Sequence, residues 1–112
     1  MYSNDEIIQI VNLVVEVSDP DRIILFGSYA YGNPDEKSDL DLLVINNDKE
    51  LSIDDEVELL YAVLLKKRQW NIKTRYDVFF NTDREVRMIA EKGGAFVEAL
   101  EKGRVVYERT YQ

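Results

Sequence analysis

The chain has 112 residues, a formal net charge of −8 and a sequence pI near 4.5. Hydrophobic residues make up 46% of it and charged residues 32%, a balance typical of soluble globular proteins that excludes disordered, fibrous and membrane-embedded classes. At this length we expect one compact domain over residues 1–112, with one core and no need for covalent cross-links.

Two residue types are missing, cysteine and histidine. Without cysteine there can be no disulfide, thiolate nucleophile or thiolate metal site in this chain. Without histidine the chain lacks the commonest general base and the commonest ligand of transition metals. Carboxylates and hydroxyls remain, so catalysis would depend on a hard cation with oxygen ligands.

The sequence also predicts where the protein works. It begins with no basic segment followed by an apolar stretch, and no apolar run approaches the roughly 20 residues that cross a bilayer. We therefore expect a cytoplasmic protein that does not enter membranes. Its acidic charge repels phosphates, which argues against extended nucleic acid as a ligand, whereas a metal ion could neutralise a single triphosphate locally.

The first half of the chain predicts one helix and two strands. A helix from about Asn4 to Val17 has apolar residues at helical spacing after a Ser3…Glu6 capping box. The continuous apolar run Ile23–Phe26 is typical of a strand buried on both faces. The alternating stretch from Asp39 to Ile45 predicts a second strand.

The second half predicts further helices around a third strand. The expected elements are a helix from Ser52 to the basic Lys66-Lys67-Arg68, a strand Tyr76–Phe80, a helix from the Thr82…Glu85 capping box to about Lys92, a last short helix, and a short strand Val105–Tyr107. This order predicts an α/β (α+β) fold in which a small mixed β-sheet is flanked by helices, in two or three layers.

The turn after the first strand is the first candidate for chemistry. Gly27 permits a sharp bend and close approach of another atom, and Ser28 offers a hydroxyl and an amide where a helix begins. The pair suits a phosphate group. Taken alone it is more often a plain turn or helix cap.

Three aspartates are the second candidate. Alternate positions on a strand place Asp39 and Asp41 on one face about 7 Å apart, where they repel by roughly 2 to 3 kcal/mol at an effective dielectric constant of 20. Solvation at an exposed edge could offset this repulsion, and so could Mg²⁺. Asp77 would add a third carboxylate if its strand is a neighbour. We expect it to be costly to bury between Tyr76 and Val78 without a cation.

Together these residues resemble a known family. Gly27-Ser28, Asp39-Leu40-Asp41 and Asp77 within an apolar strand are similar to the minimal nucleotidyltransferase family of the DNA polymerase beta-like superfamily. The resemblance covers most of the chain and implies the nucleotidyltransferase fold. One departure is Ala30-Tyr31-Gly32, because many members carry an arginine where this chain has Tyr31.

The resemblance also implies an activity and a site. Gly27 and Ser28 would cradle a nucleoside triphosphate such as ATP, while Asp39 and Asp41 would bind Mg²⁺. Asp77 would complete the metal site and help to activate an acceptor hydroxyl, so that AMP is transferred and pyrophosphate leaves. Minimal members occur as antitoxins beside a helical HEPN-type toxin, which implies a partner protein as the acceptor, in a homo- or hetero-oligomer.

Other interpretations stay open at this stage. The chain could be a catalytically silent module that neutralises a partner by contact, or a resistance-type enzyme acting on an aminoglycoside, although such enzymes use a longer chain to enclose the sugar. Tyr29 and Tyr31 could stack on a base, but packing near the turn is favoured. The basic residues Lys66, Lys67, Arg68, Lys73 and Arg75 could contact phosphates, but a solvated helix end with its loop is favoured.

Overall fold

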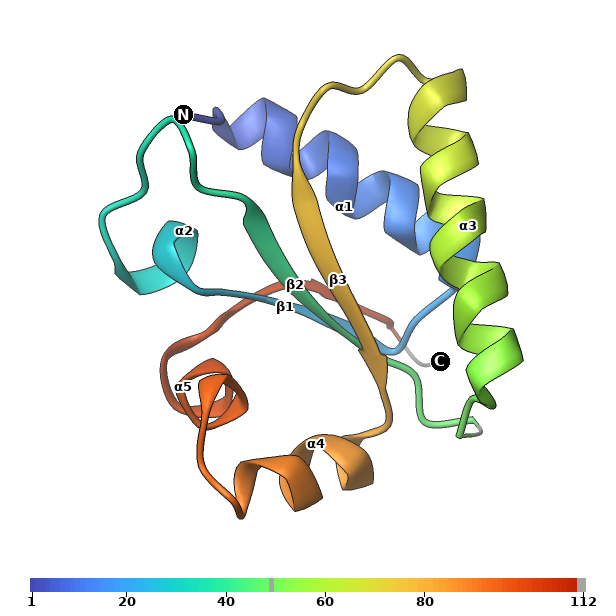
Figure 1. Ribbon diagram of the computed structural model, residues 1–112, viewed down its shortest axis with the longest axis vertical. Coiled ribbons are helices and arrows are strands. Elements are labelled where there is room, and N and C mark those ends of the chain that lie inside the picture. The colour runs from blue at the N-terminus through green and yellow to red at the C-terminus, as the bar shows by residue number, and fades with distance from the viewer. Residues whose placement is uncertain (49, 111–112) are drawn as a thin grey trace.

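The computed structural model describes residues 1–48 and 50–110, which form a four-stranded mixed sheet with helices on both faces (Figure 1). The helices are α1 Asn4–Ser18, α2 Ser28–Tyr31, α3 Ile53–Gln69, α4 Asp83–Ala90 and α5 Ala95–Lys102. The strands are β1 Arg22–Phe26, β2 Leu40–Ile45, β3 Tyr76–Asn81 and β4 Arg104–Glu108. The expected mixed α+β fold is thereby confirmed.

The strand order is β3-β2-β1-β4, so β2 and β1 are central and β3 and β4 are the edges. β1 pairs antiparallel with both β2 and β4, whereas β2 and β3 run parallel. Parallel neighbours cannot be joined by a tight turn. The chain therefore crosses from the end of β2 to the start of β3 through α3 (Figure 1).

Two apolar layers cover the sheet, one on each face. On one face, β2 contributes Leu42 and Val44 to a cluster with α1 and with Val63 of α3. On the other face, β2 contributes Leu43 and Ile45 to a cluster with α4 and α5. β2 is thus covered on both sides, which explains why nearly all of its residues are apolar.

The boundaries of the elements follow the expected signals closely. The capping boxes at Ser3 and Thr82 both form, and the Ser52 side chain caps α3. β2 begins at Leu40 rather than Asp39, α4 ends at Ala90 rather than about Lys92, and the four-residue α2 is additional to the elements expected. None of the helices in the described ranges is long and apolar enough to cross a membrane.

Asp77 is exposed, so the cost that we expected for burying it between Tyr76 and Val78 does not arise. The cause is the position of β3 at the edge of the sheet, where one flank has no neighbouring strand; Val78 and Phe80 point into the core, and Tyr76 packs against it.

The packing of β2 predicts the effect of a core substitution. Replacing the fully buried Leu42 by alanine should lower the free energy of unfolding by about 2 to 5 kcal/mol, because a cavity opens between the sheet and the α1/α3 layer. The matched substitution at Leu100 on α5, a leucine that is 41% exposed, should cost less than about 1 kcal/mol. Urea denaturation followed by circular dichroism measures both, and equal losses would contradict the packing described.

Candidate active site

The candidate residues meet at one end of the sheet, where β1 ends and β2 and β3 begin. Phe26, the last residue of β1, pairs with Asp41, and Asp41 pairs in turn with Asp77 across the parallel β2/β3 ladder. Neighbouring strands lie about 4.8 Å apart, so the two aspartates stand side by side. The structure thus brings Gly27, Asp41 and Asp77 together from three strands.

Gly27 occupies a position that no other residue fits well. Its φ angle is 73° and its ψ angle −158°, a combination that side chains with a Cβ rarely adopt. A Cβ atom at this position would lie 2.1 Å from Oδ2 of Asp41. The Asp41 carboxylate therefore packs directly against the backbone of Gly27, which is the N-cap residue of the short helix α2.

The Asp41 carboxyl carries an unfavourable negative charge. Its pKa is raised from the ordinary value of 3.8, first by burial, then by the charges of Asp77 and Asp39, and finally by a hydrogen bond with the Asp77 side chain. Within residues 1–48 and 50–110, neither Asp41 nor Asp77 forms an ion pair. Two adjacent carboxylates without a protein cation match the oxygen-ligand preference of Mg²⁺.

Asp39 lies close to this pair but has a different partner. Its Oδ1 accepts a hydrogen bond of 2.7 Å from Nε of Arg75, and Nη2 of Arg75 donates to the carbonyl oxygen of Glu36 at 2.8 Å. The same contact with Asp39 raises the pKa of Arg75. Among the described residues there is no group of three or more acidic side chains arranged to hold a metal ion. Asp39 as a third metal ligand thus stays a prediction.

Sequence reasoning missed the role of Arg75, which it grouped with the lysines at the end of α3. The structure separates Arg75 from them and places it beside the aspartates. Its backbone N–H donates to the hydroxyl of Tyr2, the Tyr2 N–H donates to the hydroxyl of Tyr29, and the two tyrosine rings stack at 5.7 Å. The signal available in the sequence was the position of Arg75 two residues before Asp77.

The other aromatic and basic residues follow the favoured interpretations. Tyr29 packs on Tyr2, and Tyr31 packs against the cluster beneath α4 and α5, so both act as packing residues. Nζ of Lys66 lies 5.8 Å from the centre of the Trp70 ring, and Nζ of Lys67 lies 5.1 Å from the centre of the Tyr76 ring. These two lysines at the end of α3 cover the rings of Trp70, just after the helix, and of Tyr76 in β3, in keeping with a solvated helix end.

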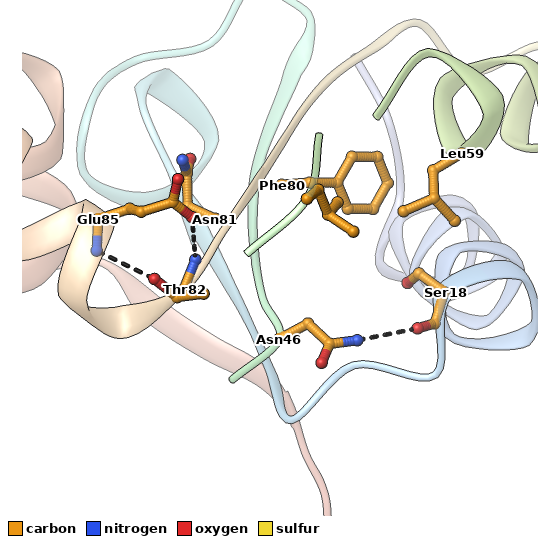
Figure 2. Close-up of a pocket in the computed structure, with 8 residues that line it drawn as sticks. Ser18, Asn46, Leu59, Phe80, Asn81, Thr82 and Glu85 are labelled. Atoms are coloured by element: carbon orange, nitrogen blue, oxygen red, sulfur yellow. Dashed lines mark hydrogen bonds between the residues drawn. The ribbon is translucent and has the colours of Figure 1, made fainter. Parts of the chain in front are cut away.

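A small cavity at the opposite end of the sheet does not compete as a ligand site. Figure 2 shows its lining, where Nδ2 of Asn46 donates to the carbonyl oxygen of Ser18 and the Thr82–Glu85 capping box closes another side. Its volume is about 20 Å³, enough for a water molecule. No buried side-chain polar atom of the described residues lacks a partner, so this cavity is a structural feature.

Comparison with known proteins identifies the family. The model of the nucleotidyltransferase domain family matches residues 7–106, from α1 into β4. A search of curated proteins found no match. The match spans most of the chain, and the chain belongs to the nucleotidyltransferase domain family. Membership supports a transferase of nucleotidyl groups in general and agrees with the mixed sheet and five helices of the structure.

The contact between Gly27 and Asp41 predicts a specific coupling. Gly27→Ala should lower the free energy of unfolding by about 1 to 3 kcal/mol, because the new Cβ meets the Asp41 carboxylate and the backbone is strained. In the Asp41→Ala background the same change should cost less, since only the backbone strain remains. A double-mutant cycle of urea denaturations measures the difference. Strictly additive losses would contradict the contact.

The charge repulsion predicts that Asp77→Asn stabilises the protein in metal-free buffer at pH 7. Because the pKa of Asp41 is raised on folding, its ionisation costs stability, and removing the neighbouring charge reduces that cost by up to about 1 kcal/mol after solvent screening. The cost is complete above the folded pKa and disappears below 3.8, where Asp41 is protonated in both states. The gain should therefore vanish at acid pH.

Denaturation midpoints of the wild type and Asp77→Asn test this prediction when they are measured in the presence of a chelator at pH 7 and again at a pH below 3.8. Asp48→Asn, at an exposed position after the other end of β2, is the matched control and should show no such gain. Unchanged or reduced stability of Asp77→Asn at pH 7 would show that the two carboxylates do not repel each other.

Proposed function

We propose that this chain is a Mg²⁺-dependent nucleotidyltransferase that moves AMP from ATP to a hydroxyl group of a partner protein. The observation that carries the proposal is the pair of adjacent carboxylates, Asp41 and Asp77, set against Gly27 with no ion-pair partner among the described residues. Membership of the nucleotidyltransferase domain family supports the class of reaction.

The residues fit a divalent cation by their chemistry. Asp41 and Asp77 would hold Mg²⁺, and Asp39 would join them after leaving Arg75, whose side chain is half exposed and able to turn away. The cation would supply charge neutralisation for the triphosphate and would polarise the phosphorus under attack. Arg75, once separated from Asp39, would have the phosphates as its nearest anions.

The turn after β1 would position the nucleotide. Gly27 has no side chain to obstruct a ligand, and Ser28 and Tyr29 lie in the first turn of α2, where helix N–H groups have no acceptor within the helix. A phosphate there would accept hydrogen bonds from these groups and from the Ser28 hydroxyl. The acceptor oxygen would bond to the α-phosphorus, the bond to pyrophosphate would break, and Asp77 would take the hydroxyl proton.

A protein acceptor suits the position of Asp77. This side chain is exposed on an edge strand, so a hydroxyl carried by another molecule can approach it directly. We propose that the chain acts in the cytoplasm as the antitoxin of a toxin–antitoxin pair, with a helical HEPN-type toxin as the partner and a tyrosine, serine or threonine of that toxin as the acceptor.

A second candidate function has its own supporting observation. Asp39 is engaged by Arg75, and the described residues contain no three-carboxylate metal group, as a domain that has lost turnover would show. Such a chain would neutralise its partner by contact alone. The two functions differ in whether the aspartates are needed to neutralise the partner.

A transfer assay separates the two candidates. The protein is incubated with Mg²⁺, each of the four nucleotides and candidate acceptors, including co-purified helical partners, and mass spectrometry detects an added nucleoside monophosphate. Asp39→Asn and Asp41→Asn should each lower transfer by about 100-fold or more. Loss of a residue that only supports a metal ligand lowers activity by about 10- to 100-fold, and loss of a ligand itself should cost at least as much. Asp48→Asn should transfer normally.

Binding of the metal gives an independent readout. Mg²⁺ should raise the melting temperature of the wild type but not that of Asp41→Asn, since ligands that bind only the folded state stabilise it. Transfer that survives both substitutions would reject the site. Partner neutralisation that survives them, with no transfer detected for any nucleotide, would establish the contact-only function instead.

A further inference from the structure

The outer face of α3 is apolar, although this helix lies at the surface. Six large apolar side chains of α3 are between 36% and 80% exposed: Ile53, Val57, Leu60, Tyr61, Leu64 and Leu65. Val63 is the fully buried residue of the helix and holds it against the core. Figure 1 shows α3 at the edge of the molecule, with one side toward α1 and the sheet and the other side facing outward.

These six side chains form one continuous surface, which we call the α3 outer face. Their spacing of three and four residues places them along one side of the helix, over a length of about 18 Å. Together they expose on the order of 500 Å² of apolar area, which matches the largest apolar patch on a typical monomer, and such patches are often functional.

The charges at the two ends of α3 complement each other. The first turn carries Asp54, Asp55 and Glu56, and the last turn carries Lys66, Lys67 and Arg68. Asp54 and Arg68 are separated by close to four helical turns and therefore lie on the same side as the apolar residues. The face thus has an acidic end, an apolar middle and a basic end.

We propose that the α3 outer face binds a second copy of this chain, with the two α3 helices antiparallel about a two-fold axis near Tyr61. In that arrangement Asp54 of each copy lies opposite Arg68 of the other, and the apolar middles cover each other. A two-fold interface requires a surface that is complementary to itself, and this charge order meets the requirement. A parallel arrangement would bring like charges together at both ends.

The size of the surface sets the strength of the dimer. Two copies would bury about 1,000 Å² in total, near the lower limit of specific interfaces, so the dimer should form reversibly at micromolar concentrations. The candidate active site stays accessible. Asp41 lies on the same face of β2 as Leu43 and Ile45, toward α4 and α5, whereas α3 covers the opposite face.

Charge reversal tests the antiparallel geometry. Asp54→Lys and Arg68→Glu should each weaken self-association about 10-fold, because both ends of the dimer then carry like charges. Mixed together, the two variants should associate at least as well as the wild type, since each copy supplies the charge that the other lacks. Sedimentation velocity over a range of concentrations measures the self-association of each variant, of their mixture and of the wild type. Failure of the mixture to regain the association of the wild type would overturn the proposed geometry.

The apolar middle is tested separately. Tyr61→Asp should reduce dimerisation at least about 10-fold without unfolding the chain, because the side chain is 58% exposed. Met88→Asp on α4, at a position 53% exposed, is the matched control and should leave the dimer intact. A wild-type chain that stays monomeric up to about 100 µM, or that only binds a different protein through α3, would overturn the proposal.

Disulfide cross-linking reports directly which residues of the two copies lie close together. Because the chain has no cysteine of its own, only the introduced cysteine can form the link. Tyr61→Cys should form a disulfide-linked dimer on mild oxidation. Ile53→Cys should not, since an antiparallel pair centred at residue 61 separates the two copies of residue 53 by about 24 Å. Efficient linkage through Ile53→Cys would indicate a different arrangement and overturn the proposal.

Discussion

The parallel pairing of β2 with β3 is the constraint on which the site depends. This register sets Asp41 beside Asp77 and, further along the same two strands, Leu43 beside Phe79. The pairing holds because β2 is central and covered by apolar layers on both faces, so the strand cannot slip by one residue without exposing core side chains. The position of the carboxylates is therefore a consequence of hydrophobic packing rather than of contacts between the carboxylates themselves.

The same pairing explains α3. A chain that leaves one end of β2 must return to the other end of the sheet before it can enter β3, and α3 carries it there. The connection needs little anchoring, and Val63 with a few half-buried neighbours provides it. The outer face of α3 is then under no requirement from the fold to be apolar. Its six exposed apolar side chains call for an explanation outside the single chain.

Much of the fold could be predicted from local patterns, because those patterns reflect local causes. Continuous apolar residues marked β1, and serine or threonine followed by glutamate marked the starts of α1 and α4, where the capping boxes form. The position of β3 at the sheet edge could not be predicted, since strand order depends on which surfaces the helices cover. Consequently the exposure of Asp77 could not be predicted, although its approach to Asp41 was expected if the two strands were neighbours.

The candidate site was predictable in its residue types and less so in its contacts. Gly27 was expected to allow a close approach, and the atom that approaches it is a carboxylate oxygen of Asp41. The Arg75–Asp39 ion pair was not foreseen, because the two residues lie far apart in sequence and nothing in the local pattern of either one reveals the other. Long-range ion pairs between exposed side chains leave no periodic signal.

The arrangement of Gly27, Asp41 and Asp77 in a row affects the free energy with which a cation would bind. In the unfolded chain the two aspartates are far apart and well hydrated, and folding alone brings their charges together. The hydrophobic core holds them there against their repulsion, so the electrostatic work of gathering the negative charge is complete before any cation arrives. A divalent ion binding there would find the carboxylates of Asp41 and Asp77 already adjacent, so none of its binding free energy would be consumed by bringing these two groups together.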